Sequence, residues 1–198
     1  MRAPDGQPEL TVIDAGPAVG FAAAGELPLL INVFAEVGIR RLVPRVVDQE
    51  VVRQERKYPG TQRRWRAAIA AGHIERMPYL SATDGDPEVI AEVARLRDLN
   101  VDDAFRDPVD LGECIVVAHA VVLRRRGHSV AVSIDDAGGR RLAAGENLPN
   151  IGTVTIAQLA IGLRKINTIT ELRTLWTKLS RTSRLPDLAA TRLLDLLP

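Results

Sequence analysis

Short apolar runs alternate with longer amphipathic segments along most of the chain. Residues 10–14 (LTVID) and 129–136 (SVAVSIDD) are the clearest strands, because both are rich in β-branched side chains and both end at turn-forming residues. Residues 39–44 and 151–154 predict short strands, and residues 73–80 predict a third strand or an extended segment. Helical spacing predicts helices over residues 17–25, 27–37, 45–58, 62–71, 87–99, 110–127 and 138–145, and only helices after residue 155.

Strands that alternate with helices predict a parallel sheet covered by helices on both faces. The strand-length runs are continuously apolar, as parallel strands buried on both faces are. The expected fold class is therefore α/β, with three layers (α/β/α), a central parallel sheet and an extra C-terminal helical part.

The segment 110–127 is apolar on almost every side, which predicts a buried helix. Asp110 with Glu113 three residues later fits a capping box at its start, and Gly127 after three arginines fits its end. Residues 81–109, which precede it, are acidic. We expect one helix there, followed by a loop.

The composition is that of a soluble globular protein, since 46% of the 198 residues are hydrophobic and 26% are charged. Cys114 is the only cysteine, which excludes a disulfide framework and a cysteine zinc site. No apolar run has the length of a membrane span, and residues 1–9 lack the pattern of an export signal. We expect a cytoplasmic protein with no membrane partner.

The net charge of +1 says nothing about a polyanionic partner, but the charges are unevenly distributed. Acids concentrate between residues 84 and 113, and bases between residues 164 and 192. This pattern suggests acidic and basic regions that steer a charged partner. Ordinary solvated helix faces explain it equally well.

Acidic side chains follow the two clearest strands: Asp14 ends one of them, and Asp135 and Asp136 end the other. Parallel strands have their carboxyl ends at one edge of the sheet, where open α/β sheets bind ligands. Glu50 and Glu113 belong to helices that are expected to start at this edge. Four or five acids are therefore expected to converge there.

A cluster of carboxylates without a basic partner nearby in sequence is costly to bury, because like charges repel. A bound divalent cation compensates for this cost, and a set of oxygen ligands favours Mg²⁺ or Mn²⁺. Such a site hydrolyses phosphodiesters by generating a metal-bound hydroxide and by neutralising charge on the phosphate.

Each acid also has a purely structural interpretation. Asp14, Asp110 and Asp136 are placed to cap helices, Glu113 to complete the capping box, and Glu50 to lie on a solvated helix face. Any one of these acids is a weak signal. Two strands that end in Asp, together with acids at the start of two helices, favour the metal site.

Other catalytic chemistries lack their motifs, because the chain has no G-x-S-x-G elbow, no Walker lysine and no three-glycine dinucleotide loop. His119 lies in the middle of an apolar helix, so we expect it to be packed rather than catalytic. A phosphohydrolase of small substrates needs an acid nucleophile with a nearby Lys or Ser, and no convincing pair is present.

Four pieces of the chain resemble a PIN domain, the ribonuclease fold of VapC-type toxins in bacterial toxin–antitoxin pairs. They are VIDAGP with Asp14, VPRVVDQEVV with Glu50, DLGECIVVAHA with Glu113 and VSIDDAGGRRLA with Asp135. They occur in family order and cover residues 11–156. The D-x-G-E helix start, the I-D-D-x-x-G-R-R-x-A segment and the IGTV after it resemble a PIN subgroup more than the compact toxins.

The resemblance implies an endoribonuclease that uses Mg²⁺ or Mn²⁺, a homodimer, and often a small antitoxin that covers the active site. Carried over position by position, it makes Asp14, Glu113 and Asp135 metal ligands, and Glu50 completes the acidic set.

Three positions beside this set stay open. Asp136 is a candidate for holding a second metal or an ordering water, and Ser133 stands where the family commonly has a hydroxyl residue beside the last acid. Asp110 lies one turn before Glu113, so either of these two is the ligand.

The resemblance also divides the chain. We expect a PIN-like nuclease domain over residues 1–156, with an acidic helical insertion at about 78–109. Residues 157–198 are then a C-terminal helical extension packed on the same domain.

The leading prediction is a metal-dependent endoribonuclease, the toxin of a toxin–antitoxin pair. The alternative is a non-catalytic PIN-like scaffold that binds RNA or protein. For the nuclease, basic side chains hold the RNA backbone through contacts that are independent of base sequence. The candidates are Arg53, Arg56, Arg63, Arg64, Arg164 and Lys165.

Overall fold

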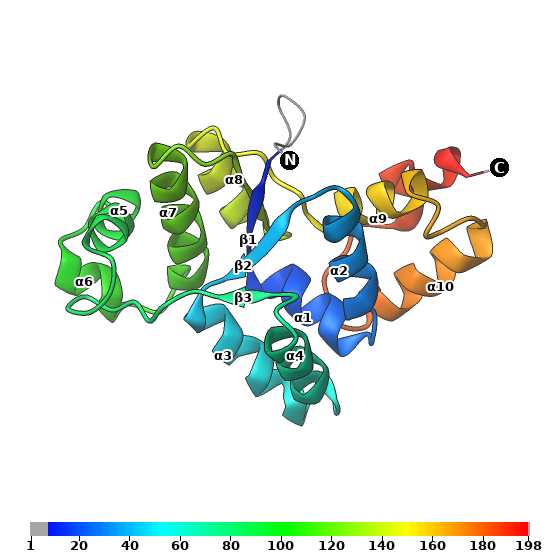
Figure 1. The fold of residues 1–198 in the computed structure, drawn as a ribbon, viewed down its shortest axis with the longest axis horizontal. Coiled ribbons are helices and arrows are strands. Elements are labelled where there is room, and N and C mark those ends of the chain that lie inside the picture. Colours follow the sequence, from blue (N-terminus) through cyan, green and yellow to red (C-terminus); the bar gives the residue numbers. More distant parts are fainter. Residues whose placement is uncertain (1–7, 198) are drawn as a thin grey trace.

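A parallel sheet lies at the centre of the computed structural model, which describes residues 8–197 (Figure 1). Within these residues the sheet has four strands, and every pairing is parallel. The strands are β1 (Leu10–Ile13), β2 (Arg40–Val43), β3 (Glu75–Arg76) and β4 (Val130–Ser133), in the spatial order β3-β2-β1-β4. The predicted α/β class with a central parallel sheet is confirmed.

Helices flank the sheet. They are α1 (Ala15–Ala23), α2 (Leu27–Glu36), α3 (Arg45–Arg53), α4 (Thr61–Ala70), α5 (Pro87–Arg97), α6 (Val101–Arg106), α7 (Leu111–Arg125), α8 (Ala137–Gly145), α9 (Thr153–Gly162) and α10 (Ile169–Ser180), with 3₁₀ turns at Gln54–Arg56, Leu188–Thr191 and Leu193–Leu196. α7 packs on β1 and β4, whereas α2 packs on β2, and Figure 1 shows these helices on opposite sides of the sheet. Because both faces are covered, β1 and β4 are buried at every position.

Two predicted elements are wrong. Residues 151–154 are not a strand, because only Asn150 forms an isolated bridge, with Val132, and α9 begins at Thr153. The loop expected before α7 contains α6, which Asn100 caps by accepting a hydrogen bond from the backbone N–H of Asp103 at 3.0 Å. A helix of six residues is too short for its apolar spacing to be recognised.

The acidic segment before α7 packs on that helix as a small second core, in which Val93 of α5 lies near Ala118 of α7. Arg126 at the end of α7 pairs with Asp86 at 2.7 Å and with Glu88 at 2.6 Å. These two acids of the segment are therefore paired with an arginine at the surface and are not free charges.

The C-terminal helices pack on the first helices, since α9 contacts α2 and α10 contacts α1. Thr182 donates a hydrogen bond from Oγ1 to the carbonyl of Gly20 at 3.2 Å. A Cβ at Gly20 would collide with Ser183 Oγ, so the glycine permits this close approach. The division of the chain at residue 156 stays a prediction.

No helix within residues 8–197 has both the length and the apolar character needed to cross a bilayer. Residues 1–7, where we expected no export signal, lie outside the described residues, as does residue 198.

Trp65 joins α4 to α3 and β3. Its side chain is fully buried, and its indole N–H donates to Asp48 Oδ1 at 2.9 Å, while Asp48 Oδ2 accepts from Arg76 at 3.2 Å.

We predict that Trp65→Ala lowers the free energy of unfolding in urea by about 3–5 kcal/mol, because it leaves a large cavity and removes a buried donor. The exposed control Arg192→Ala should stay within about 0.5 kcal/mol of the wild type. Equal losses in the two variants would contradict this role for Trp65.

Candidate functional site

β1 and β4, the two strands that end in acids, are neighbours at the point where the order of the strands reverses. The chain leaves β1 for β2 on one side, and β4 pairs with β1 on the other. Ile13 of β1 lies opposite Ser133 of β4, so Asp14 and Asp135 emerge at the same edge. The carboxyl ends at such a switch point are where open α/β sheets bind ligands.

Asp14 is the most buried of these acids, with 6% of its surface exposed. Its Oδ2 accepts the backbone N–H of Gly16 at 3.3 Å, so it caps α1 while it faces the edge of the sheet. Burial raises the pKa of its carboxyl, and the charges of Asp135 and Asp136 raise it further, against the backbone N–H groups that lower it. The cap expected from sequence is therefore present.

Asp135 and Asp136 take different partners. Both oxygens of Asp135 accept from Thr153, Oδ1 from the backbone N–H at 2.7 Å and Oδ2 from the hydroxyl at 2.6 Å. Asp136 caps α8, because its Oδ2 accepts the backbone N–H groups of Gly138 and Gly139, and these bonds lower its pKa. Thr153 is a site residue that sequence reasoning missed, since residues 151–154 were interpreted as a strand.

Ser133 lies behind the site and not in it. Its side chain is fully buried, and its hydroxyl donates to the carbonyl of Ile151 at 2.7 Å. This bond joins the end of β4 to the segment that leads into α9, so Ser133 supports the position of Asp135 through the backbone.

Glu113 does not form the predicted capping box. Asp110 is at the N-cap of α7 but has a left-handed backbone (φ 55°) and makes no side-chain cap bond. Glu113 instead lies against the start of α8, where a Cβ at Gly139 would be 3.1 Å from Glu113 Oε2. The glycine therefore leaves room for the carboxylate.

The electrostatic environment of Glu113 is set by other acids. Burial raises its pKa to about 7, helped by the charges of Asp136, Asp14, Asp110 and Glu50, in that order. Glu50 of α3 also has a raised pKa, because of burial and the charge of Asp14, which Arg53 partly opposes. Asp14, Glu50 and Glu113 therefore each lie close enough to other acids of the predicted set for those charges to raise their pKa values.

An open cleft of about 630 Å³ lies over this edge. Glu50, Asp135 and Asp136 line it on one side, and the segment Thr182–Pro186 lines it on the other. Arg140 and Arg184 are the basic side chains of its lining, and Arg140 also donates to the carbonyl of Asp135.

The carboxylates fit a hard divalent cation, because such ions prefer oxygen ligands. The positive charge of the ion would also offset the repulsion among these half-buried groups. They are not closed onto a single point: across residues 8–197, no group of three His, Cys, Asp or Glu side chains is close enough to hold a metal ion as it stands. The hydrogen bonds from Thr153 and from the first turns of α1 and α8 hold three of the acids apart.

The basic residues predicted to hold RNA are dispersed. Arg53 lies near Glu50, whereas Arg64 donates to the carbonyl of Ala22 at 2.8 Å and Lys165 pairs with Glu36 at 2.7 Å. Arg56 and Arg63 are exposed near α4, and Arg164 is exposed after the end of α9, away from Thr153 at its start. Arg140 and Arg184 were not singled out, because one follows a strand-end acid and the other lies in an irregular segment.

Comparison with known proteins agrees with this arrangement. The family model for a PIN domain (DUF3368) matches residues 10–197, nearly the whole chain. The chain therefore belongs to the PIN-domain family, and the resemblance is confirmed at that level. PIN domains are typically nucleases that use divalent metal ions. Searches of curated proteins and of solved structures found no match.

The raised pKa of Glu113 makes stability depend on pH. Its folded pKa of about 7 lies above the ordinary 4.5, so the folded state holds the proton more tightly and loses stability as the pH rises through this window. We predict that Glu113→Gln, measured by thermal denaturation without divalent metal, melts above the wild type at pH 8 and that the difference shrinks at pH 5.

The matched control is Glu75→Gln at an exposed ion pair with Arg40. The difference in melting temperature between Glu75→Gln and the wild type should be small and nearly equal at pH 8 and pH 5. A Glu113→Gln protein that melts below the wild type at pH 8 would show that Glu113 stabilises the fold, as in a capping box.

Proposed function

We propose that this chain is a metal-dependent endoribonuclease that cleaves RNA phosphodiester bonds at the acidic edge of its sheet. The observation that supports the proposal is the convergence of Asp14, Glu113 and Asp135 at the switch point of a PIN-family fold. These three would hold Mg²⁺ or Mn²⁺, with Glu50 completing the acidic set and Asp136 available to a second ion or a water. The bound metal supplies an activated water and neutralises charge on the phosphate.

The remaining parts of the site act by positioning. Thr153 fixes the carboxylate of Asp135 with two hydrogen bonds, and the N–H of Gly16 fixes Asp14. A carboxylate fixed in this way loses less conformational freedom when a metal or substrate binds. Glu113 has no donor of this kind among its described contacts, so its charge is the one that a cation compensates most directly.

Arg140 and Arg184 are the candidates for holding the RNA backbone, because they line the cleft beside the acids. Arg53 lies close enough to Glu50 to affect its pKa and extends the same set. Contacts of this kind neutralise phosphates without reading sequence, and they weaken as the salt concentration rises.

The biological setting rests on the resemblance to VapC-type toxins. We infer a cytoplasmic toxin that acts as a homodimer and is held inactive by a small antitoxin over the acidic cleft. The cleft is open on the described chain, so a partner protein can reach the acids.

One observation favours a second candidate, a non-catalytic scaffold that binds RNA or protein. Both oxygens of Asp135 are engaged by Thr153, and no preformed group of three ligands exists among residues 8–197. A scaffold would bind RNA through the same arginines without cleaving it.

Replacement of Asp14 tests the proposed activity. We predict that purified wild type cleaves single-stranded RNA with Mg²⁺ or Mn²⁺ and that Asp14→Asn lowers the rate at least about 100-fold, because a buried ligand carboxylate is lost while the shape is kept. Gel-resolved cleavage of a labelled RNA measures this.

Asp102→Asn is the matched control, since Asp102 is exposed on α6, away from the cleft residues. It should cleave at the wild-type rate. Equal cleavage by wild type and Asp14→Asn would mean that the site is assigned to the wrong residues. RNA binding without cleavage by either protein would favour the scaffold.

A further inference from the structure

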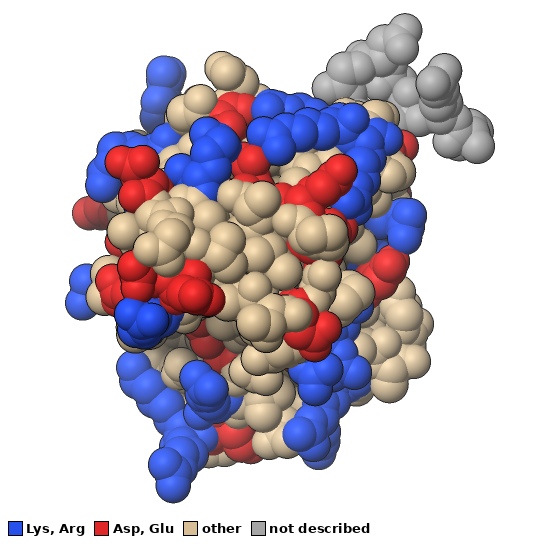
Figure 2. Space-filling view, turned by 90° about the vertical axis from the view of Figure 1, so that its left-hand side faces the viewer, with Lys and Arg blue, Asp and Glu red and all other residues tan. Residues whose placement is uncertain are grey.

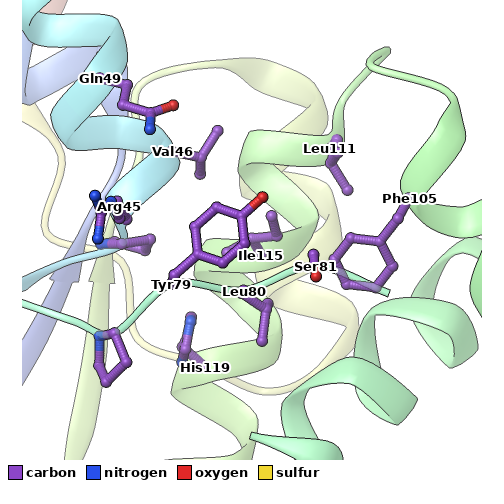
Figure 3. Close-up of a pocket in the computed structure, with 12 residues that line it drawn as sticks. Arg45, Val46, Gln49, Tyr79, Leu80, Ser81, Phe105, Leu111, Ile115 and His119 are labelled. Carbon is purple, nitrogen blue, oxygen red and sulfur yellow. The ribbon is translucent and has the colours of Figure 1, made fainter. Parts of the chain in front are cut away.

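A second pocket lies on the same edge of the sheet, beyond the ends of β2 and β3 (Figure 3). Pro44 follows β2 directly, and Pro78 to Ser81 follow β3, so both strands lead the chain into its wall. Helices α3 and α7 form the other walls. The pocket has a volume of about 230 Å³ and is lined mainly by apolar side chains, among them Val46, Leu80 and Ile115.

His119 lines this apolar pocket and carries an unsatisfied polar atom. It is 6% exposed, and its Nε2 has no hydrogen-bond partner among the described residues. Leu111, Ile115 and His119 are spaced four residues apart on α7, so one stripe of the helix lines the pocket. Buried polar atoms in proteins nearly always have a partner, so an imidazole with an unpaired nitrogen in the pocket lining is a candidate contact for a ligand.

The imidazole is uncharged near neutral pH. Burial lowers the pKa of His119 to about 4; the charge of Asp86 opposes this decrease, and the charge of Arg126 adds to it. A neutral imidazole has one N–H donor and one acceptor nitrogen. Such a group suits the edge of a heterocyclic ring, which carries both donors and acceptors.

Aromatic and cationic groups surround the opening. In the view of Figure 3, the Tyr79 ring lies between Val46 and His119, and Phe105 lies across the pocket from Tyr79. Tyr79 is 48% exposed, and the guanidinium of Arg45 lies 5.8 Å from its ring centre. Arg45 forms no ion pair with another residue of the described chain, so its charge is available to a phosphate.

The face of the molecule that carries α5 and α6 presents an uncharged area between charged groups, as Figure 2 shows. The pocket and the acidic cleft both lie against α3, because Gln49 lines the pocket and the next residue, Glu50, lines the cleft. The two linings are therefore one residue apart on this helix, a separation that a chain of nucleotides can span.

The size of the pocket limits what it can hold. Sites for cofactors and other small molecules usually start at about 300 Å³, and this pocket is smaller. Proteins that bind single-stranded nucleic acid place unstacked bases on aromatic side chains and contact their edges with polar groups. Tyr79 and His119 are positioned for these two tasks.

We propose that this pocket receives one unstacked base of the single-stranded RNA substrate, stacked on Tyr79 and hydrogen-bonded at its edge by the imidazole of His119. The proposal rests on the proposed ribonuclease function and adds a base preference to it. Arg45 holds the phosphate beside the inserted base, and Gln49 and Ser81 supply further polar contacts at the rim.

Binding without cleavage tests the pocket separately from catalysis. The full-length Asp14→Asn protein is titrated against labelled oligomers of A, C, G or U, and binding is followed by fluorescence anisotropy. We expect one base to bind at least about 10-fold more tightly than the weakest, as stacking and edge contacts allow. Wild type in a metal chelator gives the same measurement if Asp14→Asn does not fold.

Substitutions in the pocket should remove the preference without damaging the fold. On the Asp14→Asn background, Tyr79→Ala and His119→Phe should bring the four affinities within about 3-fold of one another. His119→Phe should melt at or above the parent temperature, because it removes a buried atom without a partner. Tyr79→Phe keeps the ring and should keep the preference, as should the control Leu99→Ala at an exposed position outside the pocket.

The outcomes separate the two proposals. Equal binding of all four oligomers by Asp14→Asn overturns the base pocket even if the wild type cleaves RNA. A preference that survives Tyr79→Ala and His119→Phe also overturns it, and a large fall in melting temperature for His119→Phe identifies a packed core histidine. A preference lost in both variants supports the pocket, and if the wild type still fails to cleave RNA, only the catalytic proposal fails.

Discussion

The parallel order of the strands is the constraint on which this site depends, because it gathers carboxylates that repel one another at one edge of the sheet. Parallel pairing of β1 with β4 brings Asp14 and Asp135 to one edge, and the helices that start there add Glu50 and Glu113. Folding gathers these charges in a half-buried place, where repulsion costs more than in water. Burial, together with this repulsion, raises the pKa of Glu113 to about 7.

Helix starts offset part of the repulsion. Asp14 caps α1, Asp136 caps α8, and Asp135 accepts from Thr153 at the start of α9, so three acids receive N–H groups at the positive ends of helices. Glu113 has no such donor among its described contacts. The fold therefore stabilises most of the set by itself and leaves an unbalanced negative charge, which a divalent cation would neutralise.

The pattern of apolar runs was enough to predict the sheet and the acids at its edge, because strand ends in a parallel sheet follow from the alternation of strands and helices. The same pattern could not predict how each acid is held. The spacing of Asp110 and Glu113 fits a capping box, but Asp110 has a left-handed backbone and its side chain makes no cap hydrogen bond. The contact of Thr153 with Asp135 and the approach of Ser183 to Gly20 join distant segments, and local sequence carries no signal for either.

The structural and functional interpretations of these acids are compatible. A carboxylate that caps a helix retains lone pairs for a metal, so the cap at Asp14 is compatible with the proposed role of this residue as a ligand. The segment before α7 shows a different case, because its Asp86 and Glu88 pair with Arg126. Acidity along the sequence is therefore a weaker signal than the place of each acid relative to the sheet.

Calorimetric titration with Mn²⁺ tests most directly whether the acidic edge is a metal site. The wild type, Asp14→Asn, Asp135→Asn and the surface control Asp102→Asn are compared at pH 8, where Glu113 is largely ionised. The predicted result is saturable binding to the wild type and to Asp102→Asn, and its loss in the other two variants. No binding to the wild type, or equal binding to all four proteins, would contradict the metal site.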